Sequence, residues 1–591
     1  GYRKYNNFNL DKGDVANLIY KYGATDISTF VNLVDNKINI NGLVNTVRDG
    51  NFYNGKAIFV SPNGMVVGAS GVLNVGSLGV YTPSSQIYDN YKKNPTANMT
   101  ALTESNNGKP ITINGKVIAA NDVTLSGGKV TVGKGGGIIA GVNESKMTTF
   151  GKGENAQADA LFNQLVNTDN LNAANGFASS NGNIYITTNQ TSENAGVNIS
   201  GEVKNFGKGN IEVRNIGTDG INIAGNISNA NGLVKLNNNN GDLNISGNVR
   251  NNGTTQIFNV PAEGQEVTFD DNGIKYTYKV DTKSGLNITG NIDTKGKTTI
   301  TNTGDNGLNI SGTVNNQGEL NIQNGVAGNS DSAKTRNDRM AALNISGKVS
   351  NDGTANITNY AAGGLNVAAD GSVDSLGNLA MLNTGKGGLT VNGIVNSEKS
   401  TVTNEAGALT VNGTYNYEDA KFTNNGEGGL IVNGTVSSTN AKTNSPQLVM
   451  TNNKGNFDIN ENGKVLNDGG DVTLTNNGTE FNINGTVKQN GTMQDDDEFA
   501  HPVAGTTNII NNNGNLNING TVNAKDVDAT TNILNKGDAL NISQTGSVNT
   551  SGKLNITNEG NGGLNTVLLL TTIQNMLLIK WLIQTPLYHS I

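Results

Sequence analysis

The densest carboxylate cluster in the chain is Asp495–Glu498, in the run QDDDEF, and His501 follows closely. Carboxylate oxygens suit calcium, but such a site needs ligands that converge from several directions, which adjacent side chains of one loop supply poorly. His501 has neither a nearby second histidine nor any cysteine to support it as a base. We therefore expect a solvated loop here. We predict that the chain is not an enzyme and holds no cofactor or metal, with no catalytic residue to name.

The remaining chemical signals are weaker still. The glycine-rich run GKGGG at 133–137 lacks the Gly-Lys-Ser/Thr ending and the strand-to-helix context of a phosphate loop. The absence of cysteine removes thiolate nucleophiles, disulfides and the usual zinc sites. A net charge of −8 without any basic run argues against nucleic acid as a partner.

The amino-acid composition indicates whether the chain is disordered or folded. Among 591 residues there are 78 Gly, only 8 Pro and a single Trp. Asn is far above average usage, at about 105 residues. Such a chain is either disordered or built of repeats. Abundant Val, Ile and Thr together with a mild net charge favour repeats.

One short phrase of alternating apolar residues, [LIVF]-x-[IV], followed closely by Gly, recurs through most of the chain. Successive copies mostly lie about 20 to 24 residues apart, and the longer gaps are expected to hold insertions. The copies begin at Val197, Ile221, Leu243, Leu286, Leu308, Leu343, Leu365, Leu389, Leu409, Leu430, Phe457, Phe481, Leu516, Leu540 and Leu564.

Alternating apolar residues punctuated by Gly and Asn-Gly predict strand, turn, strand, turn within each repeat. A propeller blade needs about 40 residues, and a leucine-rich repeat needs a consensus that is missing here. We therefore predict an all-β fold, a right-handed parallel β-helix, in which Leu308 stacks over Leu286 and Ile310 over Ile288. We expect Asn to take left-handed turn positions and to form amide ladders between coils, and the constant Gly to supply a positive φ or a close backbone approach.

The opening residues follow the period less strictly. KININGLV (37–44) and ITINGKV (111–117) echo the later phrase, so the β-helix is expected to begin here. Between them, Ser61, Pro62, Asn63 and Gly64 join two apolar runs. Pro presets φ and Asn-Gly favours a turn, so we predict a type I or type II turn that reverses the chain.

The segment VSPNGMVVGASGVLNVGSL (60–78) resembles the haemagglutination-activity domain of filamentous haemagglutinin-like exoproteins, and FNLDKGDVANLIY (8–20) resembles another part of it. That family usually has Asn-Pro-Asn-Gly at the turn, and Ser61 departs from this pattern. The resemblance covers roughly residues 1–120 and implies a β-helical domain exported by two-partner secretion, through an outer-membrane pore partner that recognises this segment. The Asn-rich repeats are most similar to leukotoxin-type filamentous adhesins.

A helix is expected over residues 155–175, with Ala160, Leu161, Leu165 and Val166 on one face. We expect it to lie across or cap the stacked coils, although a partner-binding helix is the alternative.

The chain is expected to fall into four parts. Residues 1–150 form a secretion domain whose first part is missing, 151–195 a connecting segment with the short helix, 196–565 the repeat stalk and 566–591 an anomalous tail. The tail has no Gly and holds the only Trp. Polar residues interrupt its apolar run, so it is too short for a membrane-spanning helix. We interpret it as a frameshifted or fragment end, with a membrane anchor as the alternative.

Taken together, the sequence predicts an adhesin, secreted or held on the surface of a Gram-negative bacterium. Its expected partners are the pore-forming secretion protein and a host cell surface or extracellular matrix. A leukotoxin-like cytotoxic exoprotein is the first alternative. A β-helical polysaccharide-processing enzyme, which would need acidic side chains on successive coils, is the less favoured one.

Overall fold

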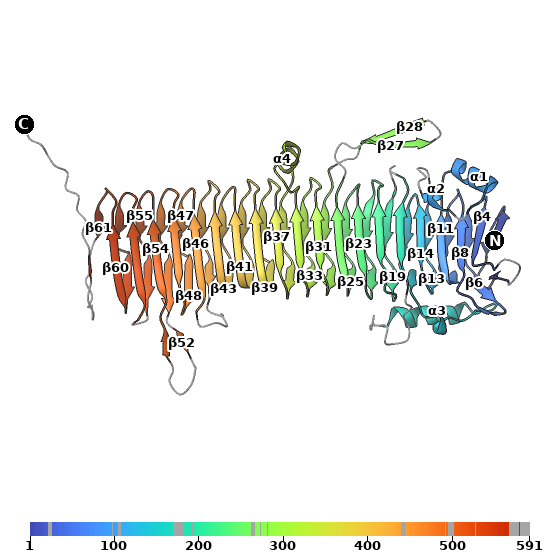
Figure 1. Ribbon diagram of the computed structural model, residues 1–591, viewed down its shortest axis with the longest axis horizontal. Coiled ribbons are helices and arrows are strands. Elements are labelled where there is room, and N and C mark those ends of the chain that lie inside the picture. The colour runs from blue at the N-terminus through green and yellow to red at the C-terminus, as the bar shows by residue number, and fades with distance from the viewer. Residues whose placement is uncertain are drawn as a thin grey trace, which may run out of the picture. The chain divides into compact units, whose positions relative to one another are not determined.

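The repeat phrase forms the same short strand in coil after coil of a parallel β-helix, which confirms the predicted fold class (Figure 1). The computed structural model describes residues 1–21, 26–96, 98–103, 108–168, 181–190, 194–261, 266–271, 274–279, 282–438, 445–490, 492–494, 501–525, 528–566 and 578–579. The chain divides into two compact units, Gly1–Glu319 and Leu320–Ile591, and each is described by itself.

Each coil contributes one strand to each of three parallel ladders. In one coil of the first unit the strands are β29 (Leu286–Ile288), β30 (Asn291–Thr294) and β31 (Thr298–Asn302). We call the ladders that contain these strands the first, second and third ladder. The repeat phrase makes the first ladder, and the constant Gly lies between the first and second strands. Leu286 pairs with Leu308 and Ile288 with Ile310, as expected from the sequence.

The strands of the first unit follow this order throughout. The first ladder also contains β2 (Asn9–Leu10), β5 (Ile38–Ile40), β9 (Met65–Val67), β12 (Ile111–Ile113), β15 (Val130–Val132), β18 (Gly196–Ile199), β21 (Gly220–Ile223), β24 (Leu243–Ile245) and β32 (Leu308–Ile310). The second contains β3 (Val15–Ile19), β6 (Leu43–Arg48), β10 (Val72–Val75), β13 (Lys116–Ala119), β16 (Gly137–Ala140), β19 (Glu202–Asn205), β22 (Asn226–Asn229), β25 (Asn248–Asn251) and β33 (Thr313–Asn316). The third contains β1 (Tyr2–Tyr5), β4 (Thr29–Val34), β8 (Lys56–Val60), β11 (Ser77–Tyr81), β14 (Val123–Gly127), β17 (Ile184–Thr188), β20 (Ile211–Asn215), β23 (Leu233–Asn238) and β26 (Thr254–Asn259).

The second unit repeats the arrangement, except that in three coils the second and third strands are fused into β39 (Ser372–Asn383), β41 (Ile394–Asn404) and β43 (Thr414–Asn424). Its first ladder contains β35 (Leu343–Ile345), β38 (Leu365–Val367), β40 (Leu389–Val391), β42 (Leu409–Val411), β44 (Leu430–Val432), β47 (Phe457–Ile459), β50 (Phe481–Ile483), β55 (Leu516–Ile518), β58 (Leu540–Ile542) and β61 (Leu564–Thr566). Its second contains β36 (Lys348–Asn351), β45 (Thr435–Ser437), β48 (Lys464–Asp468), β51 (Thr486–Asn490), β56 (Thr521–Ala524) and β59 (Ser547–Thr550). Its third contains β34 (Leu320–Asn324), β37 (Ala355–Asn359), β46 (Gln447–Asn452), β49 (Val472–Asn476), β54 (Thr506–Asn511), β57 (Thr530–Asn535), β60 (Lys553–Asn558) and β62 (Leu578–Ile579).

The constant Gly of the repeat allows neighbouring coils to approach closely. A Cβ added to Gly247 would lie 1.9 Å from the carbonyl oxygen of Gly225, and one added to Gly290 would lie 2.0 Å from that of Gly247. Neither residue has a positive φ. Of the two roles expected for this Gly, close backbone approach is therefore the one observed, and any side chain at the position would push two coils apart.

Asn forms ladders between coils, as expected. Left-handed backbone conformations in turns do not explain why Asn is so frequent. Among the described residues, Asn194 is the only Asn with a positive φ. That part of the prediction was wrong, because Gly takes the left-handed positions, for example Gly220 at φ 72° and Gly388 at φ 79°. Asn instead occupies strand ends, where its amide bonds to the next coil: Asn215 Nδ2 donates to Asn238 Oδ1 at 2.9 Å.

Short helices lie in segments that connect the strands. In the first unit α1 (Ser85–Lys93) and α2 (Thr100–Thr103) share an apolar cluster with strands of the third ladder, and η1 (Glu144–Lys146) is a short 3-10 turn. In the second unit α4 (Asp331–Asn337) interrupts a coil.

The expected helix within 155–175 is α3 (Asn155–Val166), and it lies against the second ladder (Figure 1). Leu165 is buried and Leu161 and Val166 pack at the edge of the contact, as predicted. Ala160 is exposed, so its place on the inner face was wrong. Asn155, Ala158 and Phe162 are buried on that face instead, because it is centred on Phe162. Residues 169–180 lie outside the described part of the chain.

Two antiparallel hairpins leave the coils at the longer gaps between repeats. They are β27 (Glu266–Asp271) with β28 (Ile274–Lys279), and β52 (Thr492–Gln494) with β53 (His501–Val503). A further short strand, β7 (Asn51–Phe52), pairs antiparallel with β6. The carboxylate cluster Asp495–Glu498 lies outside the described residues, as does the tail 566–591 except for Thr566 and the backbone of β62.

Candidate functional site

The predicted turn at Ser61, Pro62, Asn63 and Gly64 is a corner of the β-helix. It joins β8 of the third ladder to β9 of the first ladder, two strands that do not pair with each other. The expectation that the turn reverses the chain was therefore wrong, because a coil bends here into its next face. Asn63 does not have a positive φ, which excludes a type II turn over Ser61–Gly64, and the positive φ of 91° is at Gly64 instead.

Hydrogen bonds tie this corner to the corner of the preceding coil. The Ser61 hydroxyl donates to the carbonyl of Asn36 at 2.9 Å and accepts from the backbone N–H of Asn63 at 3.1 Å. The Asn63 amide donates to the carbonyl of Asp35 at 2.7 Å while the residue remains exposed. An Asn side chain at position 61 could accept the same backbone bond.

Asp35 links the corner to helix α1. Its carboxylate accepts from the Tyr88 hydroxyl at 2.9 Å and forms an ion pair with Lys92. The hydrogen bond from Lys92 holds the pKa of Asp35 below its ordinary value. Burial, together with the bond to Asp35, raises the pKa of Tyr88. No sequence pattern marks this group, because its members are distant along the chain and each is an ordinary surface residue by type.

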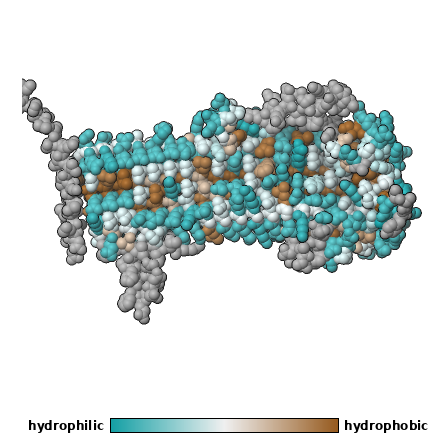
Figure 2. Space-filling view, in the orientation of Figure 1, coloured by the Kyte–Doolittle hydropathy of each residue, from teal (hydrophilic) through white to brown (hydrophobic). Residues whose placement is uncertain are grey.

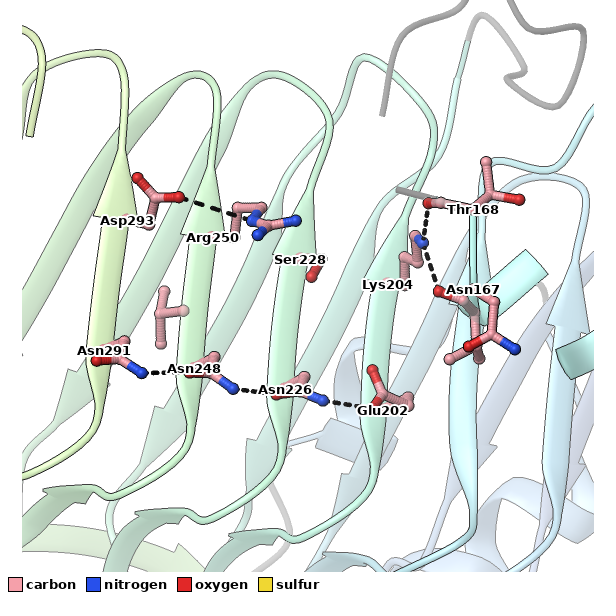
Figure 3. A pocket seen from close by; sticks show the side chains of 12 residues that line it. Asn167, Thr168, Glu202, Lys204, Asn226, Ser228, Asn248, Arg250, Asn291 and Asp293 are labelled. Atoms are coloured by element: carbon pink, nitrogen blue, oxygen red, sulfur yellow. Dashed lines mark hydrogen bonds and ion pairs between the residues drawn. The ribbon is translucent and has the colours of Figure 1, made fainter. Parts of the chain in front are cut away.

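A second feature of the first unit is a polar groove of about 540 Å³ where α3 ends over the second ladder (Figure 3). Its wall is the end of α3, at Val166, Asn167 and Thr168. Its floor crosses four successive coils at β19, β22, β25 and β30. Two columns of outward side chains line the floor, and we call these the amide column (Glu202, Asn226, Asn248, Asn291) and the charged column (Lys204, Ser228, Arg250, Asp293).

The amide column is one chain of hydrogen bonds. Asn291 donates to Asn248 at 2.9 Å, Asn248 donates to Asn226 at 2.7 Å, and Asn226 donates to the carboxylate of Glu202 (Figure 3). In the charged column Lys204 is buried, and its ammonium donates to the carbonyls of Leu165, Val166 and Thr168 at 3.1, 2.9 and 2.6 Å.

The rest of the charged column is more open to solvent. Arg250 and Asp293 lie 3.8 Å apart and are both about half exposed. The positive charges of Lys204 and Arg250 equal in number the negative charges of Glu202 and Asp293, so the groove has no net charge.

Sequence reasoning missed the groove, although the repeat contains its signal. The amide column consists of the residues directly after the constant Gly, and the charged column of the third residues after it. Aligning four repeats on that Gly would have placed Lys204, Ser228, Arg250 and Asp293 side by side. What the alignment could not supply is the wall, which depends on where α3 docks.

Other site types can be reported only for part of the chain. Over the described ranges, which omit Asp495–Glu498, no group of three or more His, Asp or Glu side chains is placed to hold a metal ion. Within the same ranges no helix is long and apolar enough to cross a membrane.

On the face shown in Figure 2, hydrophilic residues cover most of the described surface, and hydrophobic residues lie along the middle of the coils. Among the described large hydrophobic residues only Tyr2, Ile19, Leu376 and Ile394 are exposed.

No protein-family model, curated protein or solved structure matches this chain.

Proposed function

We propose that this chain is a filamentous surface adhesin of a Gram-negative bacterium, exported by two-partner secretion and binding its target through the outward faces of its β-helix. The observation that carries the proposal is the corner at Ser61–Gly64, in the segment that resembles the haemagglutination-activity domain. The corner is fixed by hydrogen bonds to the preceding coil while Asn63 stays exposed. A fixed, exposed polar turn is suited to recognition by a pore partner.

The coils support the binding half of the proposal. Parallel ladders hold outward side chains in columns, so the same chemical group recurs from coil to coil and offers a repeated contact to a large target. The target would be a host cell surface or the extracellular matrix. The protein would accordingly act from the bacterial surface or after release from it, without catalysis or a cofactor.

The test is export of the natural full-length protein with and without a co-expressed outer-membrane pore partner. Asn63→Ala removes the exposed amide and its bond to Asp35. Asn239→Ala is the matched control, because Asn239 also donates to a backbone carbonyl one coil away, that of Val260 at 3.3 Å. We expect export to require the pore and to fall severalfold for Asn63→Ala alone.

Equal export of both variants, or export without the pore, would overturn the secretion part of the proposal. A cell assay on the exported protein then separates the two functions. Adhesion without lysis of the target cells supports the adhesin, whereas lysis at the same protein concentration would favour the leukotoxin-like alternative.

A further inference from the structure

Two residues of the amide column, Asn226 and Asn248, retain unused hydrogen-bonding capacity. A primary amide has two N–H donors and an oxygen with two lone pairs. Asn226 and Asn248 each use one N–H toward one neighbouring coil and one lone pair toward the other. Each therefore keeps one donor and one acceptor for an external group. Because the ladder bonds fix which end of each amide carries the nitrogen, these donors and acceptors are preorganised.

The groove presents this pair of groups repeatedly and at a regular step. Neighbouring strands in a sheet lie about 4.8 Å apart, so four coils span about 14 Å between the outer strands. This step is comparable to the length of one hexose unit in an extended oligosaccharide. A hydroxyl group both donates and accepts, which matches an amide that offers one of each.

The chemistry of the groove excludes the other common extended ligands. A nucleic acid or polysulfated glycan needs excess positive charge, whereas Lys204 and Arg250 are balanced by Glu202 and Asp293. An extended peptide binds by adding to an open sheet edge, but the floor is a sheet face whose backbone groups pair within the ladder. A lipid or an apolar helix needs an apolar lining, whereas Val166 and Val249 are the only apolar residues in the described part of this lining.

We infer that this groove binds a neutral oligosaccharide laid along the second ladder, with the amide column bonding to successive sugar hydroxyls. Arg250 and Asp293 lie beside the amide column, where the guanidinium adds planar donors and the carboxylate adds acceptors. This deepens the adhesin proposal, on which it rests for its biological setting, by giving the class of ligand. Among the described residues, the lining contains no aromatic side chain, so we expect affinity to come from hydrogen bonds and to be insensitive to salt.

The experiment measures binding of cellotetraose and chitotetraose to the purified full chain by saturation-transfer NMR and titration calorimetry, with a heparin tetrasaccharide as the polyanionic comparison. The groove variant is Asn226→Leu/Asn248→Leu. The matched control is Asn222→Leu/Asn244→Leu, which breaks an amide contact of 2.9 Å between the same two coils, in the first ladder. Thermal unfolding of both variants checks that the coils remain formed.

We expect at least one neutral tetrasaccharide to bind, with affinity unchanged between low and high salt. The affinity of the groove variant should fall about tenfold or more, because two donors and two acceptors are removed, and the affinity of the control should fall less than about twofold. Ser228→Tyr serves as a second variant. It fills the middle of the groove without removing an amide, and it should also weaken binding by about tenfold or more.

Absence of binding by both neutral tetrasaccharides would overturn the inference. Equal binding by the groove and control variants, or salt-sensitive binding of heparin alone, would do the same. Each of these results is obtained with purified protein, so a failed glycan site and a failed secretion proposal are distinguished by separate assays.

Discussion

At the scale of single residues, the buried asparagines are the side chains that lock coils together. In the second unit they form one column at the end of the third ladder, from Asn324 to Asn535. Asn383 is typical: its amide nitrogen donates to Asn404 Oδ1 and to the Gly385 carbonyl, both at 2.8 Å, and its oxygen accepts from Asn359 at 2.8 Å. A buried amide with all these partners avoids the cost of an unsatisfied polar group.

Asn383→Asp should therefore be strongly destabilising. A carboxylate cannot donate, so Asn404 and Gly385 lose their donor and a charge is buried without a counter-ion. We expect a loss of about 3 kcal/mol in the free energy of unfolding at neutral pH, measured by urea denaturation.

Asn412→Asp is the control for this change. Asn412 belongs to an exposed amide ladder and donates to Asn392 at 2.7 Å. Its replacement should cost less than about 1 kcal/mol, since water solvates the new charge. Similar losses at the two positions would contradict the role assigned to the buried column.

Asp458 provides the reverse case, a carboxylate that already stands in an amide column. Asn482 donates to it at 2.7 Å, yet burial raises the pKa of Asp458 above its ordinary value. A raised carboxyl pKa means that the folded state binds the proton more tightly. The contribution of this group to stability is therefore greatest at acidic pH and falls as pH rises through the folded-state pKa.

Asp458→Asn should remove that pH-dependent penalty. At pH 7 we expect the variant to be more stable than the parent by less than about 1 kcal/mol, and we expect the difference to shrink below about pH 4. Thermal unfolding across this range measures it. A variant less stable than the parent at pH 7 would show that the carboxylate itself stabilises the coil.

At the scale of elements, helix α3 is held on the second ladder by two kinds of contact. Phe162 and Leu165 are buried in a cluster with Ile139 and Phe206 of the coils. Lys204 brings a positive charge to the carbonyls at the end of the helix, where the helix dipole is negative. The lysine is thereby the link between the helix and the wall of the groove.

Lys204→Gln should loosen the end of α3 without unfolding the coils. Loss of three charge-assisted hydrogen bonds should raise hydrogen-exchange rates in residues 160–166 by about tenfold or more, with the second ladder unaffected. Lys129→Gln, which breaks the more exposed ion pair to Asp219 at 3.4 Å, is the control and should leave α3 unchanged. Unaltered exchange in α3 after Lys204→Gln would mean that the apolar cluster alone holds the helix.

The sequence predicts an element well when the residues that determine it lie within one repeat, and poorly when packing against distant residues determines it. The first ladder could be predicted strand by strand, because its apolar alternation and following Gly are written in each repeat. The inner face of α3 could not, since docking against Phe206 and Ile139 turns Phe162 and Ala158 inward and leaves Ala160 outside. The contact of the Ser61–Gly64 corner with Asp35 depends on coil register, which a single repeat does not determine.

At the scale of the whole molecule, each coil contacts chiefly the coils before and after it, so stability should be a sum of neighbour terms. Gly290→Ala tests this within the first unit. The new methyl group would meet the Gly247 carbonyl oxygen at 2.0 Å, and we expect a local cost of about 2–3 kcal/mol. Hydrogen exchange should accelerate in β24, β25, β29 and β30 while β4 and β8 remain protected.

Gly13→Ala is the matched control, because Gly13 has a φ of 95° but no atom within 4 Å of an added Cβ. It should cost about 1 kcal/mol from backbone strain alone. Acceleration throughout the first unit after Gly290→Ala would show a single cooperative unit in place of locally coupled coils.

The two hairpins show where the coils tolerate inserted sequence. After the excursion that contains β27 and β28 the coil resumes in register, and Asn259 donates to Asn302 at 2.7 Å across 43 residues of chain. Asn476 likewise donates to Asn511 at 2.9 Å around the excursion that contains β52 and β53. Corners of this kind accept inserted sequence at little cost to the scaffold. Insertions and sequence changes can therefore accumulate in these excursions while the coils stay constant, and a foreign peptide could be grafted at the same places.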